Sequence, residues 1–84
     1  MPVIARFCGI VIRLLCLRPF GARLHACYGD TEIIITLPTL EVIQGDAPPV
    51  VRRVVLAWAR RHYLELLANT RLILRGQRPL TIAA

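Results

Sequence analysis

Hydrophobic residues in the first half of the chain follow the pattern of β-strands. Residues 3–17 are rich in β-branched, aromatic and leucine side chains, and Gly9 within this run predicts a bulge or bend that divides it. Further short strands are predicted over residues 24–28, 32–36 and 40–43. Their connections are a turn at 18–22, a tight hairpin at Gly29-Asp30 and a turn at 37–39. Connections this short favour an antiparallel meander of three to four strands.

The second half of the chain is predicted to be helical. Residues 50–75 contain no proline or glycine, Asp46 is a good N-cap, and Gly76 ends the element. One unbroken helix of this length would span about 39 Å. Because that is long for so small a domain, a kink or a break within residues 62–66 remains an alternative.

Helical periodicity sorts residues 50–75 into three faces. The apolar face expected to pack on the sheet contains Val51, Val55, Trp58, Ala59, His62, Leu66, Asn69 and Ile73. The arginine face contains Arg53, Arg60, Arg61, Arg71 and Arg75. The leucine ridge contains Leu56, Tyr63, Leu67 and Leu74. Because one helix face packs on one sheet, the leucine ridge needs a second copy of the chain or another protein, unless the helix breaks and the ridge enters the core.

The expected fold is therefore α+β, with a small antiparallel sheet and a long C-terminal helix, whole, kinked or split, packed on one face. Eighty-four residues make a single domain, residues 1–84. With 56% hydrophobic and 19% charged residues, the chain is too apolar for a disordered tail. Arginines interrupt every apolar run before it reaches the length of a membrane span, so no membrane partner is expected.

The net charge of +6 is the balance of eleven arginines against five acidic residues, and lysine is absent. Arginine binds phosphates and carboxylates with two parallel hydrogen bonds, which suits nucleic acid or an acidic protein. The alternative is codon usage in a GC-rich genome, which accumulates arginine and alanine whatever the function. The arginine face is the candidate nucleic-acid surface. It lacks interleaved aromatic residues, so only weak binding without sequence preference is expected.

The cysteines are Cys8, Cys16 and Cys27, an odd number without a C-x-x-C pair. This pattern predicts neither a disulfide framework nor a zinc knuckle, and favours buried thiols in a reducing cytoplasm. The apolar run that ends at Arg13 is too short for a signal peptide, which also favours the cytoplasm. No metal site and no cofactor are expected.

The two histidines are the candidate catalytic groups. His25 follows a turn at the start of a strand, and Asp30 or Glu32 across the hairpin could orient it as a general base. The alternative is a structural, hydrogen-bonded histidine. His62 is the weaker candidate because it lies on the apolar face, where Glu65 and Asn69 could bind its ring nitrogens. A triad of His25, His62 and Glu65 requires the helix to cross the second strand.

Several short motifs resemble the prokaryotic domain of unknown function 4160 family over essentially the whole chain. They are Met1-Pro2, Arg6-Phe7, Gly9-Ile10, His25, Tyr28-Gly29, Glu41-Val42-Ile43, Gly45-Asp46, Pro48, Gly76, Pro79 and Ile82. The most specific is Trp-Ala-x-x-His-x-x-Glu-Leu-Leu-x-Asn over residues 58–69. The resemblance implies an α/β domain that is often encoded beside a second small protein, as in toxin–antitoxin or regulatory pairs. The family's histidine-bearing turn, roughly Asp-His-x-Pro-Pro-His-Phe-His, keeps only its last histidine in residues 18–25.

Two functions remain open from the sequence. The leading hypothesis is a non-enzymatic cytoplasmic interaction or regulatory module, one half of a two-gene, toxin–antitoxin-like pair, whose partner is a small protein encoded nearby or a second copy of the chain. The alternative is a small RNA-directed enzyme of toxin type that uses His25 with arginine support.

Overall fold

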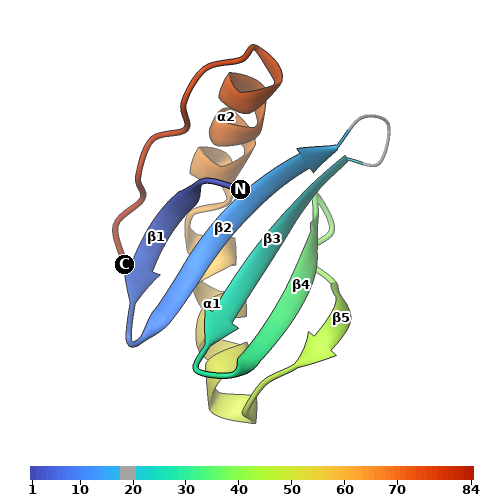
Figure 1. The fold of residues 1–84 in the computed structure, drawn as a ribbon, viewed down its shortest axis with the longest axis vertical. Coiled ribbons are helices and arrows are strands. Elements are labelled where there is room, and N and C mark those ends of the chain that lie inside the picture. The colour runs from blue at the N-terminus through green and yellow to red at the C-terminus, as the bar shows by residue number, and fades with distance from the viewer. Residues whose placement is uncertain (18–20) are drawn as a thin grey trace.

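A computed structural model describes residues 1–17 and 21–84. The strands within them are β1 (Val3–Phe7), β2 (Ile10–Leu17), β3 (Gly21–Tyr28), β4 (Thr31–Leu37) and β5 (Val42–Asp46). The helices are α1 (Pro49–Arg61) and α2 (Tyr63–Leu74). Each strand is antiparallel to its neighbour in the order β1-β2-β3-β4-β5, and both helices lie against one face of the sheet (Figure 1). The predicted α+β class and the meander are confirmed.

The described sheet has five strands, so the prediction of three to four was wrong. The run 3–17 is a hairpin and not one bent strand, because Phe7 pairs with Ile10 around a two-residue turn. Cys8 and Gly9 both have positive φ, +51° and +74°, as the tightest hairpin turns require. Cysteine rarely adopts this conformation, which is why the sequence indicated a bulge.

The last strand also begins and ends later than predicted. β5 runs through Gly45, where φ is +85° and a Cβ atom would collide with the backbone carbonyl of Glu32. Asp46 belongs to this strand and is not the N-cap of the helix. Its Oδ1 accepts a hydrogen bond from the Ala47 amide at 2.9 Å, whereas Pro48 occupies the N-cap without a side-chain bond. Of the predicted turn at 18–22, residues 18–20 lie outside the described residues, and Gly21 begins β3.

The helical half is split into α1 and α2 at His62, so it is not one long helix. His62 has φ −106° and ψ +24°, outside the helical values. This break lies at the first residue of the predicted range, 62–66. The predicted end is confirmed, because Gly76 has φ +75° and the Gln77 amide bonds to the Leu72 carbonyl at 2.9 Å.

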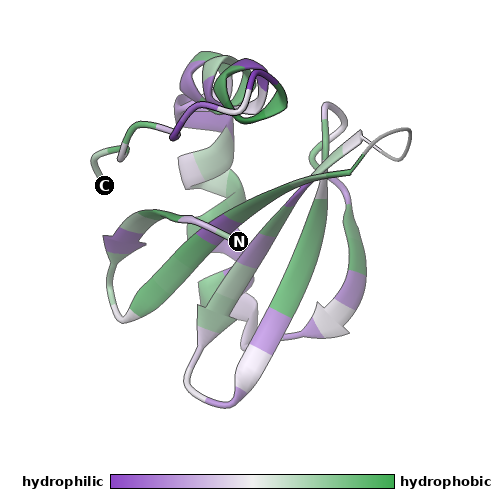
Figure 2. Cartoon of the chain, turned by 45° about the horizontal axis from the view of Figure 1, so that its top comes forward, coloured by the Kyte–Doolittle hydropathy of each residue, from purple (hydrophilic) through white to green (hydrophobic). Residues whose placement is uncertain are grey.

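The core lies between the sheet and the two helices. Figure 2 shows hydrophobic residues along much of the strands and a mixture of hydrophobic and polar residues around the helices. The fully buried large side chains include Ile4, Ile12, Leu14, Leu24, Ile33, Ile35, Val55, Trp58 and Leu66. Most of the predicted apolar helix face is buried, whereas His62 and Ile73 are half-buried. Trp58 stacks on Phe7 of β1, with ring centroids 5.2 Å apart.

After α2 the chain returns beside β1 (Figure 1), and residues 77–84 form what we call the C-terminal tail. The Ile82 amide donates to the Ile4 carbonyl at 2.7 Å, without a regular ladder. Trp58 Nε1 donates to the Ala83 carbonyl at 3.0 Å. The Asn69 amide bonds to both backbone groups of Leu80, each at 2.8 Å. The tail is therefore tied to β1 and to both helices.

Candidate functional site

The sheet face opposite the helices carries the first candidate site, and we call it the open face. In Figure 1 both helices lie behind the sheet, and no described helix or strand covers its front. Side chains alternate between the two faces of a strand. Leu24 and Ala26 of β3 are buried in the core, so His25 and Cys27 lie on the open face.

Strand register brings four chemically active side chains together there, and we call them the histidine cluster: Arg13, His25, Cys27 and Glu32. Arg13 of β2 is directly opposite His25, and Cys27 is directly opposite Glu32 of β4. His25 Nδ1 lies 3.6 Å from Glu32 Oε2. The Cys27 thiol donates to the same carboxylate oxygen at 3.2 Å. Of the two carboxylates that the sequence offered for His25, Glu32 is thus the one beside the imidazole.

Burial raises the pKa of the Cys27 thiol, Glu32 raises this pKa further, and the Arg13 guanidinium opposes the shift. A thiol with a raised pKa stays protonated at neutral pH and is a poor nucleophile. Cys27 therefore serves as a hydrogen-bond donor that helps to hold Glu32. Nδ1 is the ring nitrogen that faces Glu32, and a proton on Nδ1 leaves a lone pair on Nε2 of His25.

The histidine cluster is partly sheltered from water. The side chain of His25 is 13% exposed and that of Glu32 is 47% exposed. The chemistry available there is proton transfer at His25 beside a guanidinium. Sequence reasoning overlooked Arg13 and Cys27 as members of this site. The available signal was a polar residue inside an apolar strand, but only the strand register shows which residue lies opposite it.

His62 lies on the helix side of the sheet, so the imagined triad of His25, His62 and Glu65 is not formed. Its Nδ1 bonds to Glu65 Oε1 at 2.7 Å, and its ring lies 5.3 Å from that of Trp58. Asn69 does not contribute, because Leu80 occupies its amide. Nε2 of His62 is buried without a hydrogen-bond partner among the described residues. His62 is therefore a packed histidine at the junction between the two helices.

The helices present the second candidate surface. All five residues of the arginine face are exposed. Arg60 and Arg61 lie in the last turn of α1, where the helix dipole favours positive charge. Leu64 is 79% exposed in the first turn of α2, the exposed Ala68 lies one turn further along α2, and the exposed Ala57 lies on α1 before the break. The two helices therefore present exposed arginines together with a small set of exposed apolar side chains.

The leucine ridge is divided between core and surface. Leu56 and Tyr63 are half-buried and pack against the core, and Leu67 is half-buried as well. Leu74 at the end of α2 is 41% exposed. The break at His62 separates the ridge into one part on each helix.

The cysteines are all free, as the sequence indicated. Cys16 and Cys27 are half-buried, but Cys8 is exposed at the hairpin turn, so the expectation of three buried thiols was wrong for Cys8. Within residues 1–17 and 21–84, no group of three or more His, Cys, Asp and Glu side chains is arranged to hold a metal ion. In the same part of the chain, neither helix is long and apolar enough to cross a membrane.

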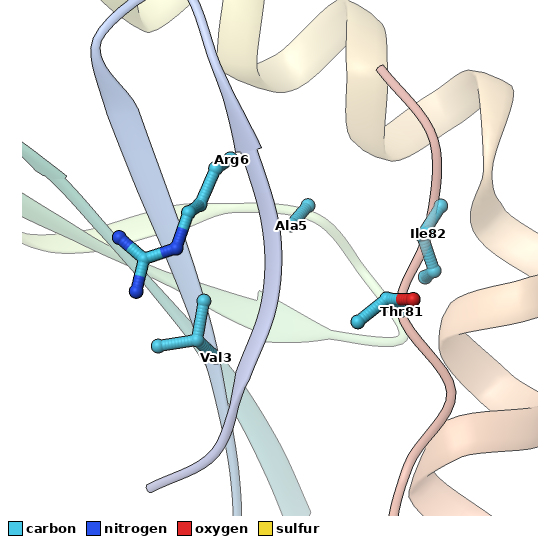
Figure 3. A pocket seen from close by; sticks show the side chains of 5 residues that line it. All are labelled: Val3, Ala5, Arg6, Thr81 and Ile82. Carbon is cyan, nitrogen blue, oxygen red and sulfur yellow. The ribbon is translucent and has the colours of Figure 1, made fainter.

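A hollow of about 340 Å³ lies between β1 and the C-terminal tail (Figure 3). Its lining residues are Val3, Ala5, Arg6, Thr81 and Ile82. The sequence gave no indication of this hollow, because it forms only where two segments from opposite ends of the chain meet.

Residues 9–69, most of the chain, match the family described as a domain of unknown function (DUF4160). The chain belongs to this family. The matched part of this DUF4160 protein contains the whole histidine cluster and the helix break at His62, whereas β1 and the C-terminal tail lie outside it. Searches of the curated proteins and of the solved structures found no match.

Proposed function

We propose that this DUF4160 protein is an interaction module that binds a small acidic protein through its helices. The observation that carries the proposal is Leu64, which is 79% exposed at the start of α2 and follows the exposed Arg60 and Arg61 at the end of α1. A large aliphatic side chain left in water forfeits about 1.5–3 kcal/mol relative to burial. A partner that covers Leu64 recovers this free energy, and the surrounding arginines select the partner's charge.

The charge on this surface is strongly one-sided. Glu65 is the only acidic residue of the two helices, and its carboxylate is bound to His62 at 2.7 Å. Among the described residues, no carboxylate lies within ion-pair distance of the arginine face. Each guanidinium can therefore offer its donors to the carboxylates of a partner.

This chemistry fits an acidic amphipathic helix as the partner's binding element. Its apolar residues would lie over Leu64, Ala57 and Ala68, and its Asp and Glu side chains would face the arginines. Complementary charges at the rim accelerate encounter and reject wrong partners. We propose that this partner is encoded by a neighbouring gene and that the two proteins form a regulatory, toxin–antitoxin-like pair.

The test is co-expression with each of the proteins encoded by the two flanking genes, followed by size-exclusion chromatography and titration calorimetry. We expect one of them to form a stable complex with the DUF4160 protein. Leu64→Asp and Arg60→Glu should each weaken its affinity at least tenfold, and added salt should weaken it further.

The matched control is Leu80→Asp, because Leu80 is also strongly exposed, at 70%, but lies in the C-terminal tail. This variant should bind as the parent does. The proposal fails if neither flanking protein binds, or if the Leu64 and Leu80 variants bind equally well.

A further inference from the structure

We propose that the open face of the sheet binds RNA and cleaves its backbone, with His25 as the residue that accepts the proton of the attacking hydroxyl. This activity goes beyond partner binding and uses the side of the molecule opposite the helices. It rests on the histidine cluster and on the distribution of charge around it.

The positive charge of the open face is concentrated on three adjacent strands. Arg6 is paired with Val11, and Arg23 with Leu15, so both lie on the same face as Arg13 and His25. Arg13 and Arg23 are diagonal neighbours on β2 and β3, a relation that places Cα atoms about 7–8 Å apart and Cβ atoms somewhat closer. Both side chains are long enough to contact the same stretch of RNA backbone.

Arg23 also has unused donor capacity. Its Nε atom is buried and has no hydrogen-bond partner among the described residues. A buried donor without a partner is costly, so the Arg23 side chain gains free energy when it turns outward and binds an anion. The acids Glu32 and Asp46 lie on the same face, but on the remaining two strands, β4 and β5. A polyanion is therefore directed toward β1, β2 and β3.

RNA is the polyanion that this chemistry fits, because it carries its own nucleophile. Nε2 of His25 takes the proton from a ribose 2′-hydroxyl, and the 2′-oxygen forms a bond to the adjacent phosphorus. The bond from phosphorus to the 5′-oxygen breaks, and water supplies the proton that this leaving oxygen needs. The products are a 2′,3′-cyclic phosphate and a 5′-hydroxyl, and the imidazolium returns its proton to solvent.

The remaining cluster residues support this step. Arg13, opposite His25, and Arg23 stabilise the negative charge that grows on the phosphoryl oxygens. Glu32 is a positioning residue: its carboxylate lies 3.6 Å from Nδ1, closes to hydrogen-bond distance when RNA binds, and so holds the imidazole with Nε2 directed away from it. The Cys27 thiol fixes Glu32 in turn. No base-stacking ring belongs to this cluster, so we expect little sequence preference.

The experiment uses the purified full-length protein and a fluorescence-quenched RNA oligonucleotide. The parent should cleave the RNA, but neither DNA of the same sequence nor 2′-O-methyl RNA, because both lack the nucleophile. Mass spectrometry of the products should show 2′,3′-cyclic phosphate ends.

Variants separate the roles within the cluster. His25→Ala and His25→Gln should each lower kcat by at least 100-fold. Glu32→Gln should lower kcat about tenfold with KM unchanged, because it misplaces the imidazole without removing a phosphate contact. Arg13→Gln should lower kcat and raise KM. Arg52→Gln is the matched control, because Arg52 is exposed on α1 and belongs to neither surface.

Circular dichroism and thermal melting confirm that each variant is folded before its rate is compared. The proposal is overturned if the parent leaves RNA intact, if both His25 variants cleave as fast as the parent, or if DNA is cut equally well. RNA that is bound but not cleaved likewise overturns it. Because no partner protein is present, these outcomes are independent of the interaction proposed for the helices.

Discussion

Asn69 is the best place to test how the C-terminal tail contributes to stability. Its side chain is 2% exposed, and its amide donates to the Leu80 carbonyl and accepts from the Leu80 amide, both at 2.8 Å. Asn69→Ala removes both hydrogen bonds. No other described residue bonds to the backbone groups of Leu80. The tail must then either keep its place with unpaired backbone groups or leave the protein surface.

Both routes destabilise the native state by a similar amount. Two neutral hydrogen bonds contribute about 0.5–1.5 kcal/mol each, and therefore about 1–3 kcal/mol together. If the tail leaves instead, Ile82, which is 6% exposed, loses about 1.5–3 kcal/mol of burial. We therefore expect Asn69→Ala to lower the free energy of unfolding by about 2–3 kcal/mol. In a domain of this size that corresponds to a fall in Tm of about 10–20 °C.

The assay combines thermal and urea unfolding with amide hydrogen exchange. The Ile82 amide, which bonds to the Ile4 carbonyl, should exchange faster in Asn69→Ala by a factor that matches the loss of stability. Gln77→Ala is the control, because Gln77 also lies in the C-terminal tail and its side chain is exposed. A change in Tm below about 3 °C, with unchanged protection of Ile82, would refute the reasoning that these bonds secure the tail.

Three further predictions concern the core and the two helix surfaces. Trp58→Ala should destabilise by about 3–5 kcal/mol, because it leaves a cavity beneath β1 and removes a bond to the tail; a Tm change of a degree or two would contradict this. If the arginine face contacts phosphates, replacing both Arg60 and Arg71 by Gln should lower the salt slope of nucleic-acid binding by about two units, and an unchanged slope excludes this face. If the leucine ridge is a dimer interface, the double change of Leu67 and Leu74 to Glu should convert a sedimenting dimer into a folded monomer, whereas unfolding would place these residues in the core.

Local sequence signals determined much of the fold. Gly29-Asp30 predicted the hairpin between β3 and β4, and Gly76 predicted the end of α2, because each position needs a backbone conformation that glycine adopts easily. The period of apolar residues correctly put Trp58 and Leu66 on the buried helix face. These features depend on residues that are neighbours along the chain, so the sequence alone carries them.

The predictions from the sequence were wrong where a residue has a conformation or a role that is uncommon for its type. Cys8 adopts a positive φ that its side chain disfavours, so a hairpin was expected to be a bulge. Asp46 has the chemistry of an N-cap, but strand pairing with Glu32 extends β5 through it. In both places, pairing with the neighbouring strand outweighed the local preference.

The candidate site shows the same division. The sequence offered both Asp30 and Glu32 as partners for His25, because Asp30 lies in the hairpin turn and Glu32 lies just after it. Only strand register decided that Glu32 shares the open face with His25 and that Arg13 lies opposite it. A contact across strands depends on which residues are paired and on the alternation of side chains, and a shift of one residue would send them to the other face. Tertiary pairing, and not composition, therefore assembled the histidine cluster.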